Sequence, residues 1–225
     1  LKLTSKAISP CADDSEDEMV LSFRAIPIAD AGSDSETCYG ESFTISDASA
    51  SNYASITWTS SGDGQFVDVT SVSPTYTPGN SDKTNGSASL VLHLAPNTPC
   101  AATVTDTILL TVHPLSAGGD IAGSTSVCDG SNSTLLELSG HTGAIVKWQY
   151  ANQLPDKGGD IWQDIANTTD SLRVTDLTQT TIYRAIVKSG NCNEAISDTA
   201  TITVYPVTAG GVIAGSDTVC SGTNS

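Results

Sequence analysis

The chain has 225 residues with 25 acidic and 9 basic side chains, and its net charge of −16 excludes nucleic acid and anionic lipid as expected partners because both repel it. Ser and Thr are the most abundant residues, Gly, Val and Ile are frequent, and there is a single Met, which favours short strands joined by turns and predicts an all-β fold without helices. No run of about 18 apolar residues is present, so the sequence predicts no membrane insertion.

Internal repeats set the expected domain organisation. Residues 208–225 repeat residues 116–133 at an offset of 92, with the same order of glycines, cysteine and asparagine. Residues 10–21 match residues 99–110 at an offset of 89. We therefore expect a window cut from a longer array, in modules of about 90 residues, which is near the lower end of what folds alone. Its expected parts are the C-terminal part of a preceding repeat at 1–27, whole modules at 28–115 and 116–207, and the start of a following repeat at 208–225.

The first whole module begins with a stretch over residues 29–41, followed by a short strand over 42–46. In the next strand, 55–60, Ile56 and Trp58 alternate with threonines, so Trp58 is expected in the core. The remaining expected elements are a turn at 62–64, a short edge segment between prolines at 74–78, a strand with Leu90, Leu92 and Leu94 on its inward face, and a last strand at 106–112.

The second whole module repeats this order of strands. Trp148 lies at an inward position of a strand over 144–150, and Tyr183 lies early in a strand over 181–188. The other expected strands cover 134–139, 161–165, the region of Leu172 and Val174, and 198–204. About seven short strands per module, with these two aromatic positions, predict tandem immunoglobulin-like β-sandwiches.

Two groups of residues resemble a known family of repeats. Residues 58–64 (Trp-Thr-Ser-Ser-Gly-Asp-Gly) and 74–78 (Pro-Thr-Tyr-Thr-Pro) resemble the PKD/Ig-like repeats of large surface proteins from Bacteroidota. Residues 146–149 (Val-Lys-Trp-Gln) and 181–185 (Thr-Ile-Tyr-Arg-Ala) resemble their other common repeat type. The resemblance covers essentially the whole chain, and it implies a segment of a giant, SprB-like gliding-motility adhesin exported by the type IX secretion system.

The resemblance also implies a covalent modification. This group of bacteria O-glycosylates Ser or Thr within an Asp-Ser/Thr-aliphatic pattern, a modification that changes the protein surface. The same residue types are abundant in any acidic β-protein, so the pattern leaves occupancy open. The candidate acceptors are Thr107, Ser171, Thr199 and Thr218.

The six cysteines favour disulfides over a zinc site. They occur one or two per repeat, with no Cys-X-X-Cys motif and no nearby His, and this spacing does not suit zinc. Small modules with modest cores commonly carry disulfides outside the cell, so we expect an oxidising, extracellular location.

The fold restricts how these cysteines can pair. In such a sandwich the turn between the first two strands and the turn before the last strand lie at opposite ends, separated by roughly 20–25 Å, whereas a disulfide needs Cα atoms within about 7 Å. We therefore predict that Cys38, in the first kind of turn, bonds Cys192, in the second kind of turn of the next module. Cys11, Cys100, Cys128 and Cys220 would then bond partners outside this window or lie near missing partners. The alternative is pairing inside each module, Cys38 with Cys100 and Cys128 with Cys192, because sequence alone does not fix connectivity.

No catalytic residue is predicted. His93, His113 and His141 are scattered along the chain, and no nucleophile motif accompanies them, so we expect no enzymatic activity. Tyr150 and Trp162 are the aromatic residues that could stack on a sugar, although core or edge packing is their expected role.

Calcium is the metal that the acidic residues could hold. Asp13 and Asp14 belong to an acidic run, and Asp30 and Asp34 lie near a module junction. Their oxygen chemistry suits Ca²⁺, but their spacing matches no recognised calcium loop, so we expect no metal and no cofactor.

These features together predict a structural stalk segment of a very long, repetitive cell-surface adhesin. Such a segment would serve gliding motility or surface attachment by transmitting force along a disulfide-stapled filament. Its expected partners are the neighbouring repeats of the same chain, and a surface polysaccharide or substratum bound through other regions. The alternative is a carbohydrate-binding or spacer module of a secreted multidomain enzyme.

Overall fold

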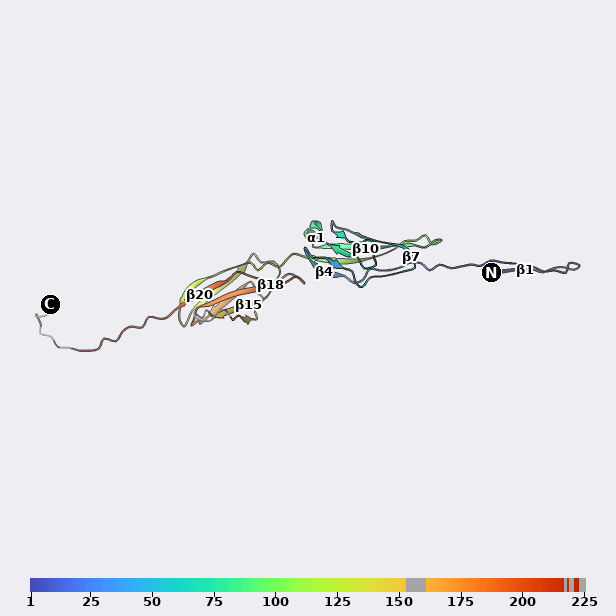
Figure 1. The fold of residues 1–225 in the computed structure, drawn as a ribbon. Coiled ribbons are helices and arrows are strands. Elements are labelled where there is room, and N and C mark those ends of the chain that lie inside the picture. Colours follow the sequence, from blue (N-terminus) through green and yellow to red (C-terminus); the bar gives the residue numbers. More distant parts are fainter. Residues whose placement is uncertain (153–160, 217, 219–220, 223–225) are drawn as a thin grey trace. The chain divides into compact units, whose positions relative to one another are not determined.

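The computed structural model describes residues 1–152, 161–216, 218 and 221–222, and nearly all of their regular structure is β-strand (Figure 1). Within these residues one helix occurs, α1 (Asn80–Asn85), so the prediction of a chain without helices was wrong. The strands are β1 (Lys2–Ser5), β2 (Ser15–Glu18), β3 (Ile28–Asp30), β4 (Ser35–Cys38), β5 (Phe43–Thr44), β6 (Ser49–Ser51), β7 (Tyr53–Ser60), β8 (Gln65–Phe66), β9 (Thr75–Thr77), β10 (Ser87–Pro96), β11 (Val104–His113), β12 (Asp120–Ala122), β13 (Thr125–Cys128), β14 (Ser133–Ser139), β15 (Ala144–Asn152), β16 (Gln163–Ile165), β17 (Ser171–Thr175), β18 (Thr181–Lys188), β19 (Ala195–Ile196) and β20 (Ala200–Tyr205).

The chain divides into two compact units. The first unit comprises Leu1–Pro114 together with Gly190–Cys192, and the second comprises Leu115–Ser189 and Asn193–Ser225. The main chain therefore passes from one unit to the other at Pro114, and three residues from the loop between β18 and β19 belong to the first unit. The candidate site consists of this short loop and the part of the first unit that it contacts.

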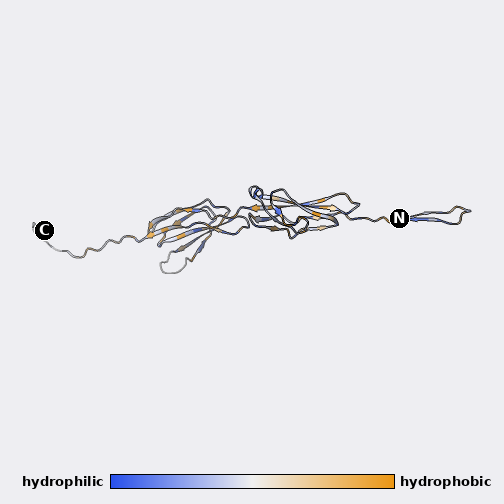
Figure 2. Ribbon diagram, turned by 45° about the horizontal axis from the view of Figure 1, so that its top comes forward, coloured by the Kyte–Doolittle hydropathy of each residue, from blue (hydrophilic) through white to orange (hydrophobic). Residues whose placement is uncertain are grey.

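The first unit is a sandwich with a four-stranded sheet in the order β4-β11-β10-β7. In β7, β10 and β11 buried residues alternate with half-buried or exposed ones, as a half-buried strand requires. Figure 2 colours the strands by the hydropathy of their residues. The buried residues pack against side chains of the smaller sheets β3-β6 and β5-β9-β8. Trp58 is at the centre of this core, as predicted, and its indole nitrogen donates to the Ser71 carbonyl at 3.1 Å.

The second unit has the same plan. Its larger sheet has the order β13-β20-β18-β15-β16, with β19 paired to β18, and its smaller sheet has the order β12-β14-β17. Trp148 is fully buried between them, as predicted, and its indole nitrogen donates to the Thr169 carbonyl at 2.9 Å. The predicted strands of this unit are confirmed with shifts of one or two residues at their ends.

The first strand of each unit is divided between two sheets. β3 pairs with β6, but β4 pairs in parallel with β11 in the other layer. Between them Gly32 adopts a φ of +93°, which other residues rarely adopt. Gly123 has a φ of +110° at the corresponding point between β12 and β13. The chain therefore changes sheets at a glycine, and the second half of the strand lies beside the last strand.

Residues 1–18 form a hairpin with a precise internal counterpart. Each of the four pairs between β1 and β2 corresponds to a pair between β10 and β11 at an offset of 89; Leu3 with Asp17, for example, corresponds to Leu92 with Asp106. The amide of Cys11 donates to Ile8 O at 3.0 Å, and the amide of Cys100 donates to Asn97 O at the same distance. The sequence match at this offset is therefore also a match in backbone pairing.

Candidate functional site

Cys38 lies at the end of β4, beside the end of β11. The two strands are parallel, with Cys38 opposite His113, and the amide of Tyr39 continues the ladder by donating to His113 O at 2.9 Å. The side chain of Cys38 is buried, with 3% of its surface exposed. The strand pairing thus fixes this cysteine at the end of the sandwich where β11 finishes.

The loop Gly190–Cys192 covers this end of the first unit. Cys192 is bonded to Cys38 in a disulfide whose Cα atoms are 5.5 Å apart, within the usual range for such bonds. The side-chain amide nitrogen of Asn191 donates to Glu36 O at 3.0 Å, so a main-chain carbonyl within β4 holds the loop. Gly190 lies against the ring of His113, where a larger residue would collide with the imidazole. The loop is therefore held by a covalent bond, a hydrogen bond and a close contact.

The disulfide joins residues that are 154 positions apart in sequence. The loop that it closes contains β5–β18, and both of its cysteines belong to the first unit. Of the two pairings considered from the sequence, this is the one in the structure. The intramodule alternative is absent, because Cys100 and Cys128 are free thiols.

The contacts of Gly190 and Asn191 were not expected from the sequence. Asn191 donates to a backbone carbonyl, and every residue has such a carbonyl, so the sequence does not indicate which residue accepts the bond. Gly190 lies in the turn Ser189–Asn191, and glycine is common in turns, so its presence did not indicate a contact with His113. His113 Nε2 donates to Glu36 Oε2 at 3.0 Å, so this histidine is a structural part of the covered end.

The second unit has an equivalent of the Cys38 position. Cys128 lies at the end of β13, opposite Tyr205 at the end of the parallel strand β20. The amide of Asp129 donates to Tyr205 O at 2.8 Å, as the amide of Tyr39 does to His113 O. Cys128 is exposed, whereas Cys38 is buried under its loop.

The other cysteines lie in hairpin turns or outside the described residues. Cys11 and Cys100 follow the equivalent prolines of the two related hairpins, and both have free thiols in the structure. Cys220 lies outside the described residues. Each described free cysteine therefore has an equivalent position elsewhere in the array.

The candidate O-glycosylation acceptors differ in accessibility. Thr107, on β11, and Thr199, before β20, are exposed, but Ser171 is half-buried at the start of β17. Thr218 is exposed and lies in the C-terminal segment. Two of the preceding aspartates have structural partners: Asp106 accepts from Ala31 N at 2.7 Å, and Asp198 accepts from Ile121 N at 2.6 Å.

The calcium candidates do not gather into one site. Asp14 accepts from Ala7 N at 2.8 Å, Asp30 from Gly32 N at 3.0 Å and Asp34 from Leu109 N at 2.8 Å. Asp13 is exposed in the hairpin turn. Across residues 1–152, 161–216, 218 and 221–222, no group of three or more His, Cys, Asp or Glu side chains could hold a metal ion.

The two aromatic candidates for sugar stacking have partners within the second unit. The guanidinium of Arg184 lies 3.9 Å from the centre of the Trp162 ring, a cation–π contact that covers one face. The same guanidinium donates to Gln149 Oε1 at 2.8 Å. The Tyr150 hydroxyl donates to Gln163 Oε1 at 2.8 Å. Both rings are thus engaged on the sheet that carries them.

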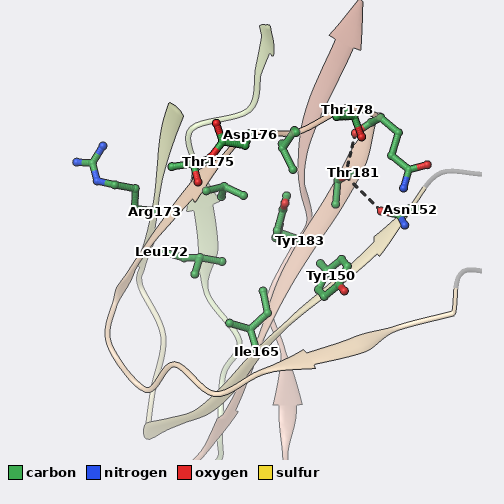
Figure 3. Close-up of a pocket in the computed structure, with 13 residues that line it drawn as sticks. Tyr150, Asn152, Ile165, Leu172, Arg173, Thr175, Asp176, Thr178, Thr181 and Tyr183 are labelled. Carbon is green, nitrogen blue, oxygen red and sulfur yellow. Dashed lines mark hydrogen bonds between the residues drawn. The ribbon is translucent and has the colours of Figure 1, made fainter. Parts of the chain in front are cut away.

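Tyr150 also lines a cavity of about 360 Å³ between β17 and the larger sheet (Figure 3). Leu172, Ile165 and Tyr183 line it with apolar surface, and burial raises the pKa of Tyr183 to about 12. On the polar side of the cavity, Thr181 Oγ1 donates a hydrogen bond to Asn152 Oδ1 at 3.4 Å. An apolar opening of this kind between two sheets exposes part of the sandwich core, and the charged residues in its described lining are Arg173 and Asp176.

The comparisons with known proteins agree on the fold. Residues 117–206 match a family described as Domain of unknown function (DUF8696). No curated protein matches the chain. Among solved structures, titin domains A168–A170 are 15% identical with a TM-score of 0.52, over 85% of this chain and 71% of that one. A titin I67–I69 fragment is 15% identical with a TM-score of 0.51, over 81% of this chain and 66% of that one. A marsupial T cell receptor is 12% identical with a TM-score of 0.51, over 83% of this chain and 74% of that one.

These similarities confirm the predicted all-β, immunoglobulin-like sandwich. In the part of the chain that the structure describes, no helix is long and apolar enough to cross a membrane. The Cys38–Cys192 disulfide suits an oxidising compartment such as the outside of the cell.

Proposed function

We propose that this chain is a structural stalk segment of a long extracellular adhesin, and that its disulfide carries tension between successive modules. The observation that supports this function is the Cys38–Cys192 bond, which spans 154 positions and fixes a loop of one module onto the preceding unit.

The disulfide changes the route by which force travels along the chain. Under tension between the two termini, the shortest covalent path follows the chain to Cys38, crosses to Cys192 and continues from there. Residues 39–191 lie outside this path, so they cannot extend while the bond is intact. At about 3.4 Å per extended residue, the 154 positions represent roughly 500 Å of chain that tension cannot release.

When the disulfide is reduced and residues 39–191 join the force path, strand direction adds resistance within each unit. β4, near the start of the first unit, is parallel to β11 at its end, and β13 is parallel to β20 in the second unit. Pulling the two ends of a unit apart therefore loads the hydrogen bonds between these strands together rather than one after another. Four register pairs in each ladder share that load.

The finer assignment is an adhesin of the SprB-like class, with PKD/Ig-like modules, exported across the outer membrane and acting in gliding motility or attachment. The repeats, the acidity and the disulfide support it. Its partners are neighbouring repeats of the same chain, and a polysaccharide or substratum bound elsewhere. A carbohydrate-binding role for this segment has less support, because Arg184 covers one face of Trp162. We propose no enzymatic activity and no cofactor.

Single-molecule stretching of the chain between its termini tests the load-bearing role. The oxidised chain is compared with the double variant Cys38→Ser, Cys192→Ser. We expect the double variant to release roughly 500 Å more contour length before it is fully extended, because residues 39–191 then join the force path. Equal lengths for the two proteins would contradict the proposed function.

The matched control is the double variant Cys100→Ser, Cys128→Ser. Both of these cysteines are free thiols in the structure. We expect this variant to retain the short contour length of the oxidised chain, which separates the effect of the bond from the effect of removing two thiols.

A further inference from the structure

We propose that the surface around Cys128 on the second unit binds the β18–β19 type of loop from a further module of this repeat type. This inference rests on the proposed function, in which such modules follow one another along one chain. The occupant is the counterpart of residues 189–192, Ser-Gly-Asn-Cys, and it arrives with a cysteine that bonds Cys128.

The backbone of this surface matches the one that already holds such a loop. β13 and β20 pair in parallel with Cys128 opposite Tyr205, just as β4 and β11 pair with Cys38 opposite His113. The hydrogen bond that follows each cysteine is also the same, at 2.8 Å for Asp129 N to Tyr205 O and 2.9 Å for Tyr39 N to His113 O. A proline follows in both cases, Pro206 and Pro114.

The groups that contact the loop have counterparts in the second unit. Asn191 donates to the main-chain carbonyl of Glu36, so Ser126, which holds the same position in the parallel ladder, can supply that acceptor although its side chain differs. Gly190 packs against the flat ring of His113, and Tyr205, which also has a flat ring, holds the corresponding register position opposite Cys128. The second unit can therefore offer the loop the same two kinds of contact, a main-chain acceptor for the asparagine and a flat ring for the glycine, although the side chains differ.

Exposure distinguishes the two surfaces. In the first unit the loop leaves Cys38 only 3% exposed. In the second unit Cys128 is exposed and Tyr205 is 58% exposed. An aromatic side chain and a free thiol are thus left open at the place where the first unit carries its partner loop.

The bond formation is a two-electron oxidation. The thiol of Cys128 and the thiol of the incoming loop each lose a proton and together lose two electrons, and one sulfur–sulfur bond forms. Glutathione disulfide accepts the electrons and protons and becomes two molecules of glutathione. Non-covalent contacts of the loop position the two sulfurs before this exchange.

The test completes a third module with known sequence. A second copy of residues 134–207 is joined after Ser225, so that residues 208–225 and the copy form one module; an Asn193→Ser change in the copy alone marks its loop by mass. The protein is oxidised in glutathione buffer and its peptides are mapped without reduction. We expect the marked loop peptide to be joined to the Cys128 peptide, with the Cys38–Cys192 pair retained.

Two results would overturn the inference: a Cys128 that remains free or bound to glutathione, and a Cys128 joined to Cys11, Cys100 or Cys220. In both cases a retained Cys38–Cys192 peptide leaves the proposed function standing. Loss of the Cys38–Cys192 peptide as well would count against the proposed function itself, so the same map separates the two failures.

A matched pair of variants distinguishes recognition from mere proximity of thiols. Gly190→Val in the copy places a side chain where the tyrosine ring lies, and we expect bond formation at Cys128 to slow by about tenfold or more. Glu194→Val in the copy, just outside the loop, should leave the rate unchanged. Equal rates for the two variants would show that the loop is not recognised and would overturn the inference.

Discussion

Asp82 is fully buried in the first unit and organises the groups around it. Its Oδ2 accepts from the Tyr76 hydroxyl at 2.7 Å, from Gly79 N at 2.9 Å and from Gly64 N at 3.2 Å. Its Oδ1 has no hydrogen-bond partner among the described residues. The sequence predicted the turn at 62–64 but not this aspartate, because a single acidic residue between polar neighbours reads as a solvated position.

Removing the Tyr76 hydroxyl should therefore destabilise the first unit. Tyr76→Phe leaves the buried carboxylate with two donors instead of three, and we expect a loss of about 2 kcal/mol, which is typical of a hydrogen bond to a charged group. Urea unfolding measures it. Tyr150→Phe is the control, since its hydroxyl bonds Gln163 near the surface, and its cost should stay below about 0.5 kcal/mol. Equal costs would contradict the role given to Asp82.

Burial also makes two tyrosines sensitive to alkaline pH. Desolvation raises the pKa of Tyr76 and of Tyr183 to about 12, and the nearby Asp82 carboxylate adds to the effect at Tyr76. Because the folded value lies above the ordinary value of 10, the stabilisation is complete below pH 10 and is lost as pH rises towards 12. Ultraviolet titration of the folded chain should show a late-ionising component that Tyr76→Phe and Tyr183→Phe each reduce. A folded chain in which all tyrosines ionise with the ordinary pKa of 10 would contradict it.

At the scale of elements, alternation predicted the long strands well and the first strand poorly. β7, β10 and β18 carry strong apolar alternation or continuous apolar runs, so their positions followed from the sequence. The division of the first strand between two sheets did not, because it depends on the backbone at Gly32 and on which distant strand accepts each half. Helix α1 was missed because its polar sequence has no apolar periodicity.

Asp106 and Asp198 hold the divided strands at equivalent places. Asp106 bonds the buried Ala31 amide, and Asp198 bonds the Ile121 amide. We expect Asp106→Ala to cost about 1–3 kcal/mol and to speed amide exchange at Ala31, because that donor loses its acceptor. Asp106→Asn keeps an acceptor and should cost less.

Thr107→Ala is the matched control for this site. It removes the candidate glycan acceptor beside Asp106 without changing the bond to Ala31. Amide exchange at Ala31 should stay at the wild-type rate. If Asp106→Ala also leaves that rate unchanged, the aspartate has no structural role, and the glycosylation pattern becomes the better reason for its presence.

At the scale of the whole molecule, the sequence period was the most informative observation. It predicted the modules and placed Cys38 and Cys192 in turns that different repeats can bring together, because the turns lie at opposite ends of one sandwich. It could not predict how the loop is held, since Asn191 acts on the Glu36 carbonyl and Gly190 on the ring of His113. Those contacts appear only when two distant segments are seen together.

Non-reducing peptide mapping of the native, full-length protein tests this account most directly. The question is which peptide carries Cys38. A Cys38–Cys192 peptide is the predicted result, and it would establish that each module is covalently tied to the next and that tension bypasses the chain between them. A Cys38–Cys100 peptide would contradict the account and would leave a string of modules stapled one by one.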